Sequence, residues 1–380
     1  MEKKFYQDLK IGILGGGQLG RMLIQEAVNF NLQIHVLDND DEAPCKNIAS
    51  KFVKGSLTDY EVVFEFGKDL DLLTIEIENV NTEALIALEA SGVKVYPQPH
   101  IIKLIQDKRT QKEFYKKNDI PTSDYVLINH KNELEAYKNY LPGVLKLGKA
   151  GYDGKGVLII ESENDFKKAF DAPGLLERKI DFEKEISVIV ARNESGEVSV
   201  YPVVELVFNS KYNLVDYLFA PAIISDDIEH KAIDTAKELI SKLQMVGLLA
   251  VEMFVTHDGQ VYVNEIAPRP HNSGHHTIEA NFTSQYGQLW RAILNLPLGS
   301  TETRNYAAMV NLLGEEGHNG IATYEGLEEI LKFEGVFPHL YGKKFTKPSR
   351  KMGHVTIVGR DIVELNEKIS LVKNTIKVKA

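Results

Sequence analysis

The sequence predicts an α/β protein with a parallel-sheet domain at its N-terminus, a larger α+β region after it and a small β-rich region at its end. Strand and helix patterns alternate through the first hundred residues, as in a parallel sheet built from βαβ units. An Asp-Gly pair between the apolar runs LLAVEMFV and QVYVNEI predicts a β-hairpin. A glycine-rich stretch, GKAGYDGKG, lies between the apolar runs GVLKL and GVLII, which predict two short strands.

The N-terminal domain is predicted from its alternating runs. KIGILGG is typical of a buried strand, QLGRMLIQEAVNF of an amphipathic helix, and QIHVLD, LDLLTIEIE and VKVYP of later strands. The pattern stops at Pro97-Gln98-Pro99, which places the end of this domain at residue 98.

The remaining elements follow in order. HIIKLIQDKRTQKEFYKKN predicts one helix, and a turn is expected at Asp119-Ile-Pro121. GLLERKI predicts a strand, Ser195-Gly196 the turn of a second hairpin, and the periodicity of 230–246 a helix. Beyond about residue 300 we expect short strands and turns, so the predicted second and third domains are 99–300 and 301–380.

Composition excludes several classes of protein. The 380-residue chain carries a net charge of −10, which argues against a general nucleic-acid or membrane surface. A single cysteine, Cys45, rules out an internal disulfide and a cysteine zinc cluster. The N-terminal run MEKKFYQDLK lacks the apolar core of a signal peptide, so we expect a cytoplasmic location.

Two glutamates are predicted to face each other across the first hairpin. Glu252 and Glu265 each lie six residues from the Asp258-Gly259 pair, which would make them cross-strand partners with Cβ atoms about 4.5–5.5 Å apart. Two converging carboxylates suit Mg²⁺, which binds a few carboxylates together with phosphate oxygens. The alternative is a solvated pair on an exposed strand face.

The run that follows Glu265 favours a site over that alternative. Arg269, His271, Asn272, His275 and His276 stand within eight positions, and prolines and a glycine between them break regular structure. Such a run is too polar for a core and too rigid for a tail, so it predicts a functional site.

The N-terminal GILGGGQLGRM resembles a dinucleotide-binding turn, with glycines at 15, 17 and 20 and Asp38 at the end of the next strand. The motif is weak, because any tight strand-to-helix turn favours glycine and any helix N-terminus can hold a phosphate. Gln18, at the turn, is therefore a stronger candidate for contacting a ligand than Asp38.

The second glycine-rich loop, 151–156, lies between two strands and lacks the Gly-Lys-Ser/Thr of a Walker loop. Its free backbone N–H groups could wrap a phosphate, with charge from Lys155 and from Lys146 on the preceding strand. A flexible surface hairpin is the alternative. A downstream two-carboxylate metal site strengthens the phosphate interpretation, because ATP chemistry needs both.

Two further polar groups are candidates. TIEIENV places Glu76 and Glu78 at the carboxyl end of a parallel strand, where open α/β sheets bind ligands. A basic cluster near the C-terminus is either an anion-binding loop or a solvated basic loop, and it comprises Lys343, Lys344, Lys347, Arg350 and Lys351.

Together these motifs resemble the ATP-grasp superfamily and, within it, the 5-(carboxyamino)imidazole ribonucleotide synthases of purine biosynthesis. GGGQLGRM, TIEIENV, QDKRTQK, GYDGKG, NEIAPRPHNSGHHTIEA and KPSRKMGH occur in that family's order and cover essentially the whole chain. The last two motifs are very specific.

The resemblance implies an ATP-grasp fold with a Rossmann-like first domain and a mobile lid at about 118–183. It also implies a ligase that uses ATP and Mg²⁺, is a homodimer, and joins bicarbonate to aminoimidazole ribonucleotide through carboxyphosphate. ATP contacts are implied for Lys108, Lys146, Gly151, Tyr152, Asp153, Gly154, Lys155, Gly156, Val157, Glu177, Arg178, Lys179, Ile180, Glu185, Asn264 and Glu265. Aminoimidazole ribonucleotide contacts are implied for Gln18, Leu19, Glu76, Tyr152, Asp153, Lys343 and Arg350. Catalytic roles are implied for Arg269, His271, Asn272 and Lys155, and metal binding for Glu252 and Glu265.

The chain departs from the family pattern at two positions. Family members commonly carry Glu-Asn-x-His where this chain has Glu205-Leu-Val-Phe208, which puts one nucleotide contact in doubt. Lys108 stands where arginine is frequent, which keeps the charge and loses bidentate geometry.

Two rival functions remain. One is another ATP-grasp carboxylate–amine ligase with a different acceptor. The other is a nicotinamide-dependent oxidoreductase built on the first hundred residues, which leaves the paired glutamates and GYDGKG without a role.

Overall fold

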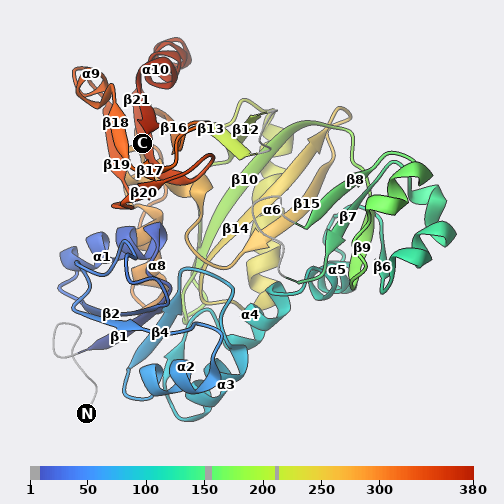
Figure 1. Ribbon diagram of the computed structural model, residues 1–380, viewed down its shortest axis with the longest axis horizontal. Helices are drawn as coiled ribbons and strands as arrows, with labels where there is room; N and C mark the ends of the chain where they lie inside the picture. The colour runs from blue at the N-terminus through green and yellow to red at the C-terminus, as the bar shows by residue number, and fades with distance from the viewer. Residues whose placement is uncertain (1–8, 150–155, 210–213) are drawn as a thin grey trace.

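The computed structural model of the chain describes residues 9–149, 156–209 and 214–380. Within these ranges the chain forms a parallel sheet of five strands, antiparallel sheets of nine and four strands, and two short two-stranded ribbons (Figure 1). The predicted α/β class is confirmed. The helices of the described ranges are all too short or too polar to cross a lipid bilayer.

The N-terminal sheet has the strand order β3-β2-β1-β4-β5. The chain starts in the middle, winds to one edge and then returns to the other side, so the carboxyl ends of β1 and β4 flank the point of reversal, where α/β sheets bind ligands. The strands are β1 (Lys10–Leu14), β2 (Gln33–Asp38), β3 (Lys51–Lys54), β4 (Leu72–Ile75) and β5 (Lys94–Val95). The helices are α1 (Gln18–Asn29), α2 (Tyr60–Gly67) and α3 (Thr82–Ala90).

The single helix predicted after this sheet is wrong, because the chain forms two helices. α4 (Pro99–Ile105) ends before Asp107, whose side chain caps α5 (Lys108–Lys117) by accepting a hydrogen bond of 3.0 Å from the Arg109 N–H. This new start places Lys108 in the first turn of α5.

The four-stranded sheet follows, in the order β6-β9-β7-β8. It packs its own small core, which includes Ile128, Leu145 and Leu176. The strands are β6 (Tyr125–Ile128), β7 (Gly143–Leu147), β8 (Val157–Ile160) and β9 (Gly174–Arg178), and two 3₁₀ segments, η1 (Lys131–Tyr140) and η2 (Glu163–Lys168), lie beside them. In Figure 1 this sheet stands at one side of the molecule, beyond β14 and β15.

The nine-stranded sheet has the order β15-β14-β10-β12-β13-β16-β21-β19, with β11 paired to β10. It therefore continues from the middle of the chain into the C-terminal region through the β13–β16 pair. The strands are β10 (Phe182–Arg192), β11 (Val198–Val200), β12 (Val204–Asn209), β13 (Leu214–Ala220), β14 (Gly247–Thr256), β15 (Val261–Ala267), β16 (Tyr306–Leu313), β19 (Val336–Leu340) and β21 (Lys351–Gly359).

The strands β10 and β14 are buried on both faces, which explains their long apolar runs. Leu249 and Val251 pack with helix α6 (Asp226–Leu243), while Leu248 and Ala250 pack with α8 (Gln285–Ile293) and the N-terminal sheet. Trp290 on α8 donates a hydrogen bond of 2.9 Å to the Leu23 carbonyl of α1, which ties the two regions together. Glu252 continues the face of Leu248 and Ala250.

The C-terminal region contains more regular structure than the predicted short strands and turns. Besides β16 and β21 it includes a 14-residue helix, α10 (Ile362–Thr375), whose Leu365 and Ile369 pack against the sheet. Its smaller elements are β17 (Gly320–Ile321), β18 (Thr323–Glu325), α9 (Leu327–Ile330), β20 (Phe345–Thr346) and β22 (Lys377–Lys379). The segment before it holds η3 (Asn272–Gly274) and α7 (Thr277–Ala280).

Candidate active site

Glu252 on β14 and Glu265 on β15 are cross-strand partners, as predicted. The turn is not centred on the Asp258-Gly259 pair as predicted, because Val255 pairs with Val261 and the Thr256 N–H donates to the Gln260 carbonyl at 3.0 Å. A β-bulge at Asn264 then restores the pairing, because Met253 pairs with Val263 while Glu252 pairs with Glu265. The bulge also breaks the buried–exposed alternation, so that both Asn264 and Glu265 face the site.

The two glutamates have opposite electrostatic environments. Lys108 lies 2.8 Å from the Glu265 carboxylate and lowers the pKa of Glu265 to about 2. Burial, followed by the Glu265 and Glu185 carboxylates, raises the pKa of Glu252 well above its ordinary value. The Glu265 side chain keeps 46% of its surface exposed against 13% for Glu252, so a ligand can reach Glu265. The two neighbouring carboxyl groups therefore have pKa values shifted in opposite directions.

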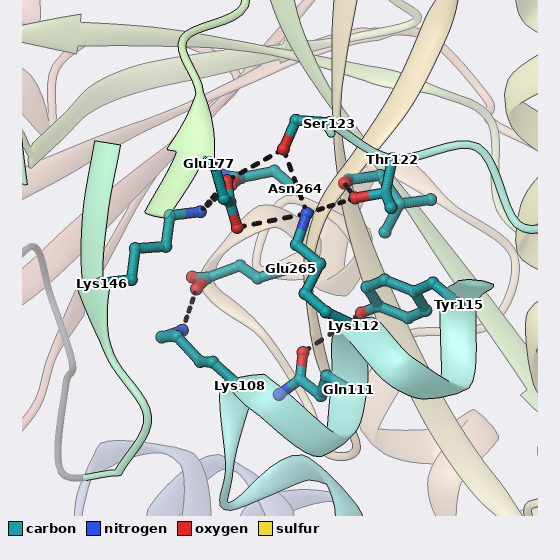
Figure 2. A network of polar contacts seen from close by, with 11 residues as sticks. Lys108, Gln111, Lys112, Tyr115, Thr122, Ser123, Lys146, Glu177, Asn264 and Glu265 are labelled. Carbon is teal, nitrogen blue, oxygen red and sulfur yellow. Dashed lines mark hydrogen bonds and ion pairs between the residues drawn. The ribbon is translucent and has the colours of Figure 1, made fainter. Parts of the chain in front are cut away.

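Glu177 on β9 is a third carboxylate of the site, and two buried lysines form ion pairs with it (Figure 2). The Lys146 ammonium on β7 lies 3.0 Å from its Oε2 and also donates to the Asn264 amide oxygen at 3.0 Å. The Lys112 ammonium on α5 lies 3.2 Å from its Oε1. Burial alone would raise the pKa of Glu177, but the two lysines outweigh it and the pKa lies below the ordinary value.

Lys112 is a residue of this site that the sequence did not lead us to predict. Its spacing could have indicated it, because Lys108 and Lys112 stand four residues apart in QDKRTQK and therefore share one face of a helix. Both ammonium groups point from α5 toward the carboxylates of β9 and β15 in Figure 2.

The run after Glu265 divides between the site and the core. The His271 imidazole lies 3.6 Å from the Glu252 carboxylate, and Arg269 forms an ion pair of 2.8 Å with Glu78. His275 and His276 are 1% and 2% exposed, so the expectation that this run is too polar for a core is wrong for these two residues. Burial lowers the pKa of both imidazoles, that of His276 to about 4, so they are neutral core residues.

Glu76 closes the glycine-rich turn of the N-terminal sheet. Its carboxylate accepts hydrogen bonds of 2.6 Å from the Gly17 N–H and 2.7 Å from the Gly20 N–H, at the N-terminus of α1. A Cβ on Gly17 would lie 2.5 Å from the Glu76 carboxylate, which explains the glycine. The donors that would hold a dinucleotide pyrophosphate are thus occupied, which argues against the nicotinamide alternative.

The other predicted aminoimidazole ribonucleotide contacts have varied positions. Gln18 begins α1 and is half-buried, while the Leu19 side chain packs in the core. Lys343 donates to the Lys351 carbonyl at 2.8 Å, and Arg350 donates to the Phe345 carbonyl at 2.7 Å. These bonds tie both cations to the loop that carries them, near β20 and β21.

The remaining predicted ATP contacts surround the four-stranded sheet. Gly156 and Val157 lie at the start of β8. Arg178 lies over the Tyr140 ring, Lys179 forms an ion pair of 2.6 Å with Glu161, and Ile180 is half-buried. Burial raises the pKa of Glu185 on β10 to about 7. The predicted residues Gly151, Tyr152, Asp153, Gly154 and Lys155 lie outside the described residues.

The described residues contain no group of three or more His, Cys, Asp or Glu side chains arranged to hold a metal ion. A cation at this site would therefore rest on two carboxylates and on oxygens that a ligand supplies. Phe208, which stands where the family carries histidine, is half-buried on β12 against the cluster around Leu206 and Leu218.

Known families match the chain along most of its length. The ATP-grasp domain matches residues 113–286, the ribonucleotide synthetase preATP-grasp domain residues 9–106, and the phosphoribosylaminoimidazole carboxylase C-terminal domain residues 307–368. The chain is 37% identical to the N5-carboxyaminoimidazole ribonucleotide synthase of Bacillus subtilis, over 93% of this chain and 92% of the relative. It spans only 69% and 66% of the phosphoribosylaminoimidazole carboxylases of Ogataea methanolica and Vigna aconitifolia.

Solved structures are similar over nearly the whole chain. The N5-carboxyaminoimidazole ribonucleotide synthetase of Thermotoga maritima has a TM-score of 0.91 at 43% identity, covering 98% of this chain and 99% of that one. The Aspergillus clavatus enzyme, solved with ADP and 5-aminoimidazole ribonucleotide, has a TM-score of 0.89 at 35% identity, covering 97% and 98%.

Proposed function

The chain belongs to the N5-carboxyaminoimidazole ribonucleotide synthase family of ATP-grasp ligases, and we propose how its charge network serves that reaction. The enzyme joins bicarbonate to aminoimidazole ribonucleotide at the expense of ATP, in purine biosynthesis. The observation that carries the proposal is the Glu252–Glu265 pair, with Lys108 on one carboxylate and Lys146 beside the bulge at Asn264. This arrangement brings cations and oxygen ligands together, as phosphoryl transfer requires.

The nucleotide would lie between the four-stranded sheet and the β14–β15 hairpin. Lys108 projects from α5 toward Glu265, and Lys146 projects from β7 toward Glu177 and Asn264 (Figure 2). Both ammonium groups would meet the phosphates, as the resemblance implies, while the 177–180 segment meets the adenine and Glu185 the ribose. ATP binding would then exchange carboxylate partners of the two lysines for phosphate oxygens.

Mg²⁺ fits the pair of carboxylates. The raised pKa of Glu252 arises from burial and from the Glu265 and Glu185 carboxylates, and a divalent cation held by Glu252 and Glu265 would relieve this repulsion. Carboxylates are hard oxygen ligands of the kind that Mg²⁺ binds, together with phosphate oxygens. Charge on the transferring phosphoryl group would be neutralised by the bound Mg²⁺.

Bicarbonate would be held by Arg269, His271 and Asn272. His271 already lies beside Glu252, and its Nδ1 is 2.9 Å from the Ser273 hydroxyl, which orients the ring. Bicarbonate attacks the terminal phosphorus of ATP, forming carboxyphosphate and releasing ADP. Because carboxyphosphate hydrolyses readily, the site must exclude water, and we expect the four-stranded sheet to cover it.

Aminoimidazole ribonucleotide would enter from the N-terminal sheet, at the edge marked by Gln18 and Glu76. Its exocyclic amine attacks the carboxyl carbon of carboxyphosphate, phosphate leaves with the electrons of the C–O bond, and the amine loses a proton. Lys343 and Arg350 would hold the ribonucleotide phosphate, which agrees with their position on a basic loop. A homodimer in the cytoplasm is the assembly and location that the resemblance implies.

The proposal is tested by measuring phosphate release from ATP with each substrate omitted in turn. We expect release to require bicarbonate and to rise when aminoimidazole ribonucleotide is added. Turnover without bicarbonate, or with a different amine in place of the ribonucleotide, would instead favour another ATP-grasp ligase.

A further inference from the structure

Lys112 is a deeply buried cation to which neither the sequence nor the proposed reaction assigns a role. It is 3% exposed and stands one turn after Lys108 on α5. A buried ammonium group is costly unless its three donors find partners. Lys112 has three oxygen partners, the Glu177 carboxylate at 3.2 Å, the Ser123 hydroxyl at 3.2 Å and the Thr122 hydroxyl.

These partners hold Lys112 in place from two directions. The Thr122 hydroxyl donates to the Val263 carbonyl at 2.7 Å, beside the bulge that positions Asn264. The Ser123 hydroxyl donates to Glu177 Oε2 at 3.1 Å. Lys112 is thus connected to β9 through Glu177 and to β15 through the Thr122 hydroxyl.

Lys146 holds the same carboxylate in a different way. It contacts Glu177 at 3.0 Å and Asn264 at 3.0 Å, and it is one of the two lysines that the proposed function directs to the nucleotide phosphates. When Lys146 moves to the phosphates, Glu177 loses one of its two cations. Since Glu177 is 5% exposed, water cannot replace that cation.

We propose that Lys112 is a positioning residue for nucleotide binding, a permanent counter-ion that keeps Glu177 neutralised and so lets Lys146 leave it for the phosphates. The inference rests on the proposed role of Lys146. Without Lys112, Lys146 would be the remaining buried cation beside Glu177, and the carboxylate would hold it. The pKa of Lys112 is lowered to about 8, first by burial, which leaves it mostly charged at neutral pH.

The test is a double-mutant cycle on nucleotide affinity. Lys112→Met removes the charge at nearly constant volume, and we expect ADP to bind at least about ten-fold more weakly by calorimetry. The KM for ATP should rise more than kcat falls, because the effect is on binding. Lys116→Met, an exposed lysine on the same helix, is the matched control and should bind ADP like the native chain.

The second half of the cycle separates positioning from packing. In a Glu177→Gln background there is no carboxylate to trap Lys146, so Lys112→Met should change ADP affinity by less than about three-fold. An equal loss in both backgrounds would overturn the proposal, as would native ADP affinity in Lys112→Met. If Lys112→Met does not fold, the Lys112→Met/Glu177→Gln protein is compared with Glu177→Gln alone.

A failure of the proposed function would have a different signature. Glu265→Gln tests the metal and phosphate site without changing Glu177 or Lys112. If Glu265→Gln turns over ATP normally, the site assignment fails. If Glu265→Gln is inactive and Lys112→Met binds ADP normally, only the inference about Lys112 fails.

Discussion

The Lys108 ammonium lies 2.8 Å from the Glu265 carboxylate, although 157 residues separate them in the chain. One of the two paired carboxylates therefore already carries a cation, and the other, Glu252, has its pKa raised by burial and by its acidic neighbours. Nucleotide and Mg²⁺ would enter this site by exchanging partners among charges that are already paired. Such exchange limits the cost of burying charge in either state.

Glu265→Gln should abolish ATP turnover and leave the fold intact. The change removes a proposed metal ligand, and we expect kcat to fall by at least about 10²-fold, as for loss of other groups that stabilise a transition state electrostatically. Phosphate release measures the effect, and circular dichroism checks the fold. Glu183→Gln, an exposed glutamate on β10, is the control. Near-normal turnover of Glu265→Gln would refute the site assignment.

Lys108→Met and Lys108→Arg should differ. Methionine removes the cation that is the largest cause of the low pKa of Glu265, so ATP should bind more weakly and the Glu265 pKa should rise from about 2 toward its ordinary value. Arginine keeps the charge, and we expect its KM for ATP to stay within about ten-fold of native. Steady-state kinetics over a range of ATP concentrations would decide, and equal losses in both variants would contradict a role for charge.

Glu76→Gln should destabilise the N-terminal domain. An amide oxygen is a weaker acceptor than a carboxylate for the Gly17 and Gly20 N–H groups, and its NH₂ group has no acceptor among them. We expect the free energy of unfolding to fall by about 1–3 kcal/mol in urea titrations. Glu89→Gln, an exposed glutamate on α3, should change it by less than about 0.5 kcal/mol. No loss in Glu76→Gln would mean that the carboxylate is not required at the helix N-terminus.

His276→Gln should make the protein less sensitive to acid. The pKa of the buried imidazole is lowered from 6.5 to about 4, so between these values the unfolded chain binds more protons than the folded one. The native protein therefore loses stability as the pH falls from 6.5 to 4, and this residue accounts for up to about 3 kcal/mol of that loss.

The check is the difference in unfolding free energy between pH 7 and pH 4.5, measured for each protein. His276→Gln should show a smaller difference than the native chain, whatever its stability at pH 7. His230→Gln, an exposed histidine on α6, should match the native pH dependence. If this difference in unfolding free energy is the same in His276→Gln as in the native chain, the buried imidazole is not neutral in the folded protein.

The paired glutamates show how far sequence reasoning reached. The Glu252–Glu265 pairing was predicted by counting from the turn, and it is correct. The count did not include two features of the hairpin. The longer loop shifts the strand register by one residue, and the bulge at Asn264 shifts it back by one residue. The bulge depends on the neighbouring segment, since the Val263 N–H donates to the Pro121 carbonyl at 2.8 Å. Counting along one hairpin could not reveal it.

The histidine run shows the opposite outcome. Five polar residues in a row of eight predicted a site, yet His275 stacks on His354 of β21 with ring centroids 4.7 Å apart. His354 is 79 residues away from His275 in the chain, and its Nδ1 lies 3.0 Å from the Tyr341 hydroxyl within the same cluster. Polarity alone could not distinguish a buried imidazole cluster from an exposed site.

By itself the sequence determined four strands of the N-terminal sheet and its first helix, the pairing of Glu252 with Glu265, and the family, but it did not indicate β3. These depend on spacing along one segment, or on the order of motifs, and both can be read directly. Only the tertiary structure decided which charge neutralises which: Lys108 with Glu265, Lys112 and Lys146 with Glu177, and Glu76 with the glycine turn. Buried charges are paired by the packing of distant elements, because each must find an opposite charge or donor wherever the fold removes water.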